Sequence, residues 1–131
     1  MDVFVDTSAF LAVLNAGDKM HSSAMDTWRR TLSSDDELIT TNYILVETNA
    51  LLQHRLGMKA VRVFEQEITH ALDVKWVDEH QHRAGMSSLL VSGRRKLSLV
   101  DCVSFEVMRS LGLSHYFSFD KHFAEQGFVS I

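Results

Sequence analysis

Proline is absent from the 131 residues and cysteine occurs once, and both facts narrow the kind of protein that the sequence encodes. Proline makes up about 5% of average proteins, so its absence excludes a proline-rich linker, and we expect no second domain attached through one. The single Cys102 excludes an intrachain disulfide. It lies in an apolar, helical segment, where we expect a buried and inert thiol.

The chain also lacks long apolar runs and an excess of positive charge. No run approaches the roughly 20 apolar residues of a membrane span, and no basic leader or apolar signal core precedes the first strand. We therefore expect a cytoplasmic protein without a membrane partner. The net charge of −4 argues against a protein that binds nucleic acid mainly by bulk positive charge. It leaves open an enzyme whose metal ions and local basic patches handle phosphates.

What is present is the composition of an ordinary globular domain, with 46% hydrophobic and 23% charged residues. This balance excludes a disordered chain or a coiled coil. A chain of this length is large enough to bury a hydrophobic core, and we expect one domain at 1–131.

The apolar periodicity and the glycines that end helices predict alternating strands and helices. Expected strands span residues 2–6, 38–40, 74–77, 115–119 and 128–130. Expected helices span residues 8–16, 21–32, 42–56, 59–72, 79–91 and 99–111. Strands separated by helices favour an α/β fold, a three-layer α/β/α sandwich with a central, mainly parallel sheet. Such sheets bind ligands at the carboxyl ends of their strands.

Four acidic residues lie within or directly after apolar stretches. Asp6 and Asp120 each end an expected strand, whereas Glu47 interrupts an apolar helical segment and Asp101 follows residues 97–100. A carboxylate in apolar surroundings is costly unless something pairs with it, most simply a cation. The four residues together predict a cluster that holds a divalent metal ion.

Such a cluster suits phosphodiester hydrolysis. Hard oxygen ligands hold Mg²⁺ or Mn²⁺, and the metal lowers the pKa of a bound water and neutralises developing charge. Each acid also has a plainer interpretation. Asp101 fits a helix-capping residue three positions after Ser98, Glu47 fits an ion-paired surface acid, and Asp6 and Asp120 fit turn residues. The coincidence of all four favours the metal cluster.

Four segments of the chain resemble, in order, the motifs of PIN-domain ribonucleases, and most of all those of VapC-type toxins from bacterial toxin–antitoxin pairs. These segments are VDTSA at 5–9, TNYILVET at 41–48, LSLVD at 97–101 and SFDKHF at 118–123. Each motif alone is weak, but the order and spacing of all four are specific. The resemblance covers essentially the whole chain, and it implies a single PIN domain at 1–131.

The resemblance implies endonucleolytic cleavage of RNA that depends on Mg²⁺ or Mn²⁺. It assigns catalysis and metal binding to the acidic quartet, which comprises Asp6, Glu47, Asp101 and Asp120. It also assigns supporting hydroxyl groups to Thr7 and Ser98. A cognate antitoxin protein, an RNA substrate and a homodimer are the partners it implies.

Other polar residues are less distinctive. Arg94, Arg95 and Lys96 precede the helix of Asp101, and they fit either RNA-phosphate contacts or a solvated loop. Arg29 and Arg30 fit exposed helix faces. For His122, within the motif of Asp120, we expect a packing or positioning role rather than metal ligation.

Several other functions remain as alternatives. A receiver-like signalling domain would use Asp78 as phosphoacceptor, but it requires paired acids after the first strand and leaves Glu47 and Asp101 without a role. A phosphatase with an aspartyl nucleophile requires a second acid two residues after Asp6, where Ser8 stands. A PIN nuclease of RNA maturation or decay, or a non-catalytic PIN binding module, is also compatible with the residues.

Overall fold

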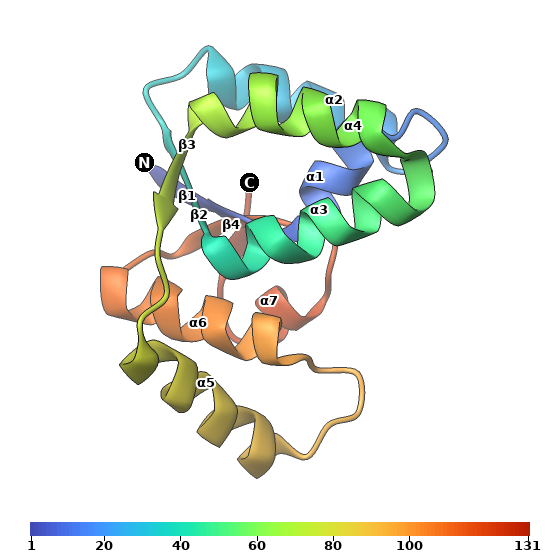
Figure 1. Cartoon of the computed structure of the whole chain (residues 1–131). Helices are drawn as coiled ribbons and strands as arrows, with labels where there is room; N and C mark the ends of the chain where they lie inside the picture. The colour runs from blue at the N-terminus through green and yellow to red at the C-terminus, as the bar shows by residue number, and fades with distance from the viewer.

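Five parallel strands in the order β3-β2-β1-β4-β5 form the centre of the structure, a computed structural model that describes residues 1–131 (Figure 1). The strands are β1 (Asp2–Val5), β2 (Glu37–Thr41), β3 (Leu72–Lys75), β4 (His115–Phe117) and β5 (Val129–Ser130). The helices are α1 (Thr7–Leu14), α2 (His21–Leu32), α3 (Asn42–Leu56), α4 (Met58–Val63), α5 (Glu79–Ser92), α6 (Leu99–Leu111) and α7 (His122–Glu125). None of these helices combines the length and apolar composition that a membrane span requires.

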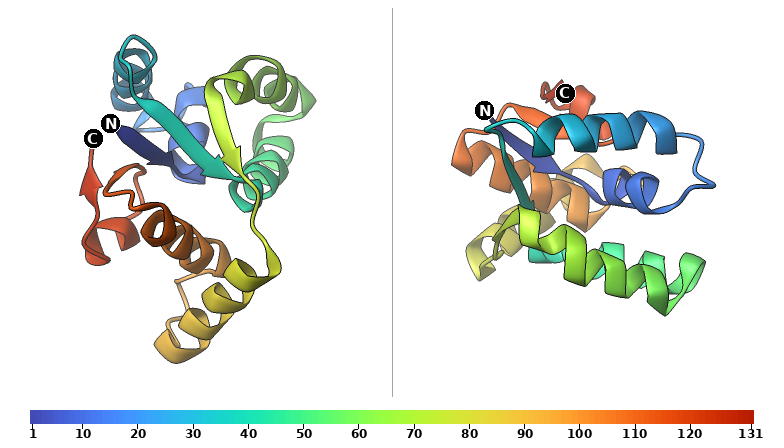
Figure 2. Two further views of the ribbon diagram at one scale, coloured as in Figure 1. Left: turned by 90° about the vertical axis from the view of Figure 1, so that its left-hand side faces the viewer. Right: turned by 90° about the horizontal axis from the view of Figure 1, so that it is seen from above.

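The helices cover both faces of the sheet. Figures 1 and 2 show α1 to α4 on one side, α6 and α7 on the other, and α5 packed against the outer surface of α6. Parallel strands need crossover connections, and these helices supply them. The expected three-layer α/β/α sandwich is confirmed, and its sheet is parallel throughout rather than mainly so.

The chain reverses its direction across the sheet between β1 and β4. From β1 it proceeds outward through β2 to β3, and from β4 it proceeds the opposite way to β5. The carboxyl ends of two such neighbouring strands border a crevice where α/β proteins bind ligands. Val5 pairs with Phe117 in register, so the next residues, Asp6 and Ser118, lie side by side at that edge.

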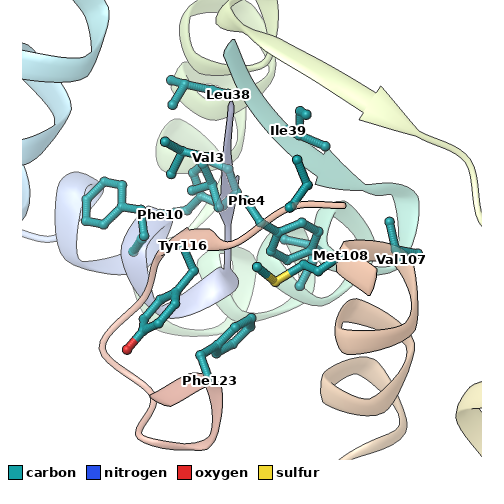
Figure 3. Close-up of a cluster of buried hydrophobic side chains, with 14 of the residues drawn as sticks. Val3, Phe4, Phe10, Leu38, Ile39, Val107, Met108, Tyr116 and Phe123 are labelled. Carbon is teal, nitrogen blue, oxygen red and sulfur yellow. The ribbon is translucent and has the colours of Figure 1, made fainter. Parts of the chain in front are cut away.

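The core explains why these strands lie at the centre. Val3, Phe4 and Val5 are fully buried, as near-continuous apolar strands in a doubly covered sheet must be. Figure 3 shows Val3 and Phe4 packed with residues from β2, β4, α1, α6 and α7. Phe123 of α7 contacts Tyr116 and Phe105 with ring centroids 5.1 Å apart in each pair. These contacts fix the segment that follows β4.

The segment expected as one helix at 59–72 is divided. After α4 it forms a π-helical turn, η1 (Phe64–Ile68), and a 3₁₀ turn, η2 (Thr69–Ala71), and β3 then begins at Leu72. The strand lies two residues earlier than expected because Leu72 pairs with Leu38 of β2. Trp76, expected inside the strand, is 75% exposed. The short helix α7 is an addition to the expected elements.

Candidate active site

Asp6 lies directly after β1 and is only 4% exposed. It caps the N-terminus of α1, where its carboxylate accepts a hydrogen bond from the backbone N–H of Ser8. The hydroxyl groups of Ser8 and Ser118 donate to the same carboxylate oxygen at 3.0 and 2.9 Å. These hydroxyl groups fix the orientation of Asp6 from two sides of the crevice.

Asp101 lies in the first turn of α6, where it forms a capping box with Ser98. The Ser98 hydroxyl accepts from the Asp101 backbone N–H at 3.1 Å, and the Asp101 carboxylate accepts from the Ser98 N–H at 3.0 Å. The interpretation of Asp101 as a helix-capping residue is therefore correct. Because Asp101 is also buried beside other acids, capping alone does not account for its surroundings.

Asp120 and Glu47 complete the acidic quartet from two further segments. Asp120 follows β4; its N–H donates to the Ser118 hydroxyl, and its carboxylate accepts from the His122 N–H, both at 2.9 Å. Glu47 lies on α3 and is half-buried. No ion pair joins it to a basic residue, so the alternative of an ion-paired surface acid is wrong.

The charges of the four carboxylates act on one another. Burial raises the pKa of Asp6 to about 6, with Asp101 contributing, against the opposing hydrogen bonds from Ser118 and Ser8. Burial also raises the pKa of Glu47, to which Asp101 and Asp120 add. The pKa of Asp101 is raised by burial and by Asp120. The structure thus brings the four predicted acids to one edge of the sheet.

These residues fit a divalent cation. None of the four carboxylates pairs with a lysine or arginine, and buried acids without a counter-charge are costly. The most closely spaced group of possible metal ligands comprises Asp101, Asp120 and His122, whose ligand atoms all lie within 4.8 Å of one another. Asp6 and Glu47 interact with this group through their charges but are not part of it.

Three neighbours of the acids are additions to the site residues that the sequence predicts. Ser8 and Ser118 hold Asp6, and their hydroxyl oxygens lie 3.0 Å apart, which joins the ends of β1 and β4. The signal for both is present in the sequence, since a serine stands two residues after Asp6 and two before Asp120. His122, expected to have a packing role, is buried within the most closely spaced group of possible metal ligands.

The other predicted residues have mixed surroundings. Thr7 is buried and its hydroxyl accepts from Thr48 at 3.1 Å, which joins α1 to α3 beside Glu47. Arg94 forms an ion pair with Glu125 at 2.9 Å. Arg95 and Lys96 are exposed and unpaired. The basic loop is therefore less available to a phosphate at Arg94 than at its two neighbours.

A parallel α/β sandwich with clustered carboxylates at its reversal point, none of them paired with a lysine or arginine, defines a class of protein that could hold a divalent cation there. Within that class, the family model described as the PIN domain matches residues 3–129 of the chain. The 23S rRNA-specific endonuclease VapC20 of Mycobacterium tuberculosis is 34% identical over 130 residues, which cover 98% of this chain and 97% of that protein. The chain belongs to the PIN-domain family, and within it to the VapC proteins.

Solved structures agree with this assignment. The crystal structure of M. tuberculosis VapC20, described as a sarcin–ricin loop cleaving toxin, matches with a TM-score of 0.87 and 33% identity over 98% of each chain. VapBC2 from Rickettsia felis, bound to a DNA fragment from its promoter, matches with a TM-score of 0.74 and 8% identity, over 100% of this chain and 98% of that one. FitAcB from Neisseria gonorrhoeae matches with a TM-score of 0.70 and 14% identity, over 100% of this chain and 96% of that one. VapBC2 and FitAcB share the fold of this chain at low sequence identity.

Proposed function

We propose that this chain is an endoribonuclease that depends on Mg²⁺ or Mn²⁺ and acts as the toxin of a toxin–antitoxin pair. The observation that carries the proposal is the convergence of Asp6, Glu47, Asp101 and Asp120 from four segments, with no lysine or arginine paired to any of them. Hard carboxylate oxygens are the ligands that these ions prefer. A receiver-like signalling domain would leave Glu47 and Asp101 without a role, and an aspartyl phosphatase would require an acid where Ser8 stands.

The residues of the chain divide the work between metal binding and orientation. A bound Mg²⁺ or Mn²⁺ supplies an activated water and neutralises charge on the scissile phosphate. Ser8 and Ser118 keep Asp6 in one orientation, and the capping box with Ser98 does the same for Asp101. Thr7 is held by Thr48 beside Glu47. The acids are therefore arranged before the ion binds, which reduces the cost of binding it.

Removing single acids tests this proposal. Asp6→Asn and Asp101→Asn should each reduce RNA cleavage by about 100-fold or more, because the loss of a ligand weakens the metal site. Asp26→Asn, at an exposed position of α2, is the matched control and should retain full activity. The measurement is the rate of cleavage of purified RNA at saturating Mn²⁺, with circular dichroism to establish that each variant is folded. Full activity of either site variant would contradict the role of the quartet.

We infer further that the substrate is 23S rRNA at its sarcin–ricin loop. The inference is supported by the 34% identity with VapC20 across nearly the whole length of both chains. Incubating intact ribosomes with the protein and mapping new 5′ ends by primer extension tests it. A single cut in the sarcin–ricin loop is expected, whereas cuts confined to tRNA or messenger RNA would refute this substrate and leave the nuclease proposal standing.

The proposed toxin requires an antitoxin that keeps it inactive. The fold shared with VapBC2 and with VapBC-1 from nontypeable Haemophilus influenzae is consistent with such a partner. We expect a tail of the antitoxin to bring a basic residue toward the quartet, where it competes with the metal. Coexpression with an adjacent antitoxin gene should restore growth and yield a copurifying complex. A chain that is harmless when expressed alone would refute the toxin role.

We also propose that residues 1–131 form a single PIN domain that assembles as a homodimer. A pocket of about 340 Å³ borders Glu47 and is lined mainly by apolar residues: Asn42, Tyr43, Val46, Glu47 and Val100. Val46 on its rim is 70% exposed, which suits burial against a second copy. Val46→Glu should shift the sedimentation profile to the monomer; Val91→Glu, at an exposed residue of α5 outside this pocket, should not.

A further inference from the structure

His122 is a buried histidine without a hydrogen-bond partner. It begins α7 and is 6% exposed, and both of its ring nitrogens are shielded from solvent and unpaired. A buried polar group left in this state costs free energy unless another species satisfies it. Phe123 beside it is fully buried in the aromatic cluster, so the start of α7 is fixed and the imidazole is not free to turn outward.

The nearest polar atom to the ring belongs to Asp120. Nδ1 of His122 lies 2.7 Å from Oδ1 of Asp120, which is an ion-pair distance if the imidazole is protonated, although the two atoms are not aligned for a hydrogen bond. That oxygen already accepts from the backbone N–H of His122 at 2.9 Å. Two adjacent ligands of one metal ion also approach each other this closely without a hydrogen between them.

The distances agree with a shared ion. In an octahedral site with bonds of about 2.1 Å, adjacent ligand atoms are about 3 Å apart and opposite ones about 4.2 Å apart. One ligand atom from each of Asp101, Asp120 and His122 lies within 4.8 Å of the others. The three residues come from α6, the end of β4 and α7, so only the folded chain brings them together.

We propose that His122 is a metal ligand, and that with Asp101 and Asp120 it forms a mixed nitrogen–oxygen site selective for Mn²⁺, Co²⁺ or Zn²⁺ over Mg²⁺. Imidazole nitrogen suits transition-metal ions such as Zn²⁺ best, and Mn²⁺ accepts it more readily than Mg²⁺, which prefers oxygen ligands. This replaces the packing or positioning role that the sequence favours for His122. The inference rests on the proposed function only in taking Asp101 and Asp120 as metal ligands.

A direct test is pulsed electron paramagnetic resonance of the Mn²⁺-loaded protein, which detects a nitrogen nucleus bound to the ion. The wild type should show ¹⁴N coupling of the strength of a directly bound imidazole. His122→Gln should lose it, and His80→Gln, at an exposed position of α5, should keep it. A wild-type spectrum without such coupling overturns the inference. This measurement uses the wild type alone, so it does not depend on whether the variants fold.

Calorimetric titration provides the second test. Mn²⁺ should bind about 10-fold or more weakly to His122→Gln than to the wild type, whereas the affinity for Mg²⁺ should change by less than about threefold. Equal losses for both ions, or no loss for Mn²⁺, would mean that His122 only positions Asp120 and would overturn the inference. The nuclease proposal and the ligand role of His122 can fail separately. If the wild type cleaves RNA in Mg²⁺ but its Mn²⁺ spectrum shows no nitrogen coupling, the nuclease proposal stands and the ligand role of His122 fails.

Discussion

Asp6 combines deep burial with a raised pKa, and these properties govern how the site responds to pH. The ordinary pKa of an aspartate carboxyl group is 3.8, and burial raises the pKa of Asp6 to about 6 in the folded chain. The folded state therefore holds the proton more tightly than the unfolded state between these values. The charged form is tolerated in the fold at a cost, which a bound cation would offset.

We expect the metal-free protein to lose stability as the pH rises from about 4 to about 7. A group with a raised folded-state pKa contributes stability below its unfolded value and loses it as the pH rises through the folded value. A shift of about 2 units corresponds to roughly 3 kcal/mol as an upper limit. Glu47 and Asp101 act in the same direction.

The measurement is urea unfolding in EDTA at several pH values. Asp6→Asn should lose much of this pH dependence and be more stable than the wild type near neutral pH, because it removes the buried charge. Asp26→Asn, at an exposed site, should retain the wild-type profile. Parallel curves for wild type and Asp6→Asn would show that Asp6 is not the buried titrating group.

At the scale of elements, α5 and α6 pack closely against each other at Gly85. Gly85 of α5 faces Val103 of α6, and a Cβ at Gly85 would lie 2.5 Å from the Val103 Cγ2 atom. It would also lie 3.1 Å from the Val103 backbone nitrogen. The glycine is therefore required for the approach of the two helices, although it weakens α5 as a helix.

Gly85→Ala should destabilise the protein by about 1–3 kcal/mol, because overpacking outweighs the gain of about 1 kcal/mol in helix propensity. Ser87→Ala, at an exposed position of the same helix, is the control and should be neutral. Urea unfolding measures both. A stabilised Gly85→Ala variant would mean that α5 is free to move away from α6.

The loop between α5 and α6 carries three basic residues just before the helix of Asp101. Neutralising Arg94, Arg95 and Lys96 to glutamine should weaken RNA binding and reduce its dependence on salt. For single-stranded RNA, the slope of log affinity against log salt is negative, and each phosphate that the protein no longer neutralises makes it less steep by about 0.7. Arg94→Gln alone should have little effect because Arg94 is paired with Glu125.

Binding is best measured in the Asp101→Asn background, so that the RNA stays intact. Replacing Arg29 and Arg30 of α2 by glutamine changes the charge elsewhere and should leave the slope unchanged. A triple variant with the wild-type slope would identify the loop as merely solvated.

At the scale of the whole molecule, a hydrophobic cluster of 25 buried residues holds the fold together. Chelation should therefore stop RNA cleavage without unfolding the chain. Circular dichroism should be unchanged in EDTA, and Ca²⁺, with its larger and less regular coordination, should not restore activity. Undiminished cleavage in excess EDTA would indicate a metal-independent nuclease or a contaminant.

The sequence by itself determined most elements and the positions of the acids. Alternation of apolar strands with amphipathic helices is local information, and so are the capping motif at Ser98 and the acids Asp6 and Asp120 that follow β1 and β4. The sequence does not show that the helix expected at 59–72 changes to a π-helical turn at Phe64–Ile68. The buried residues Phe64 and Ile68 are four positions apart, a spacing that fits a regular α-helix as well as the observed turn.

Only the tertiary structure decided which segments meet. The Ser118 hydroxyl reaches Asp6 across 112 positions of the chain because β1 and β4 are neighbours in the sheet, and no local pattern encodes that pairing. The burial of His122 against Asp101 and Asp120 likewise depends on α7 packing through Phe123 onto the core. Local propensity places the carboxylates at the ends of elements, and long-range packing makes them a single site.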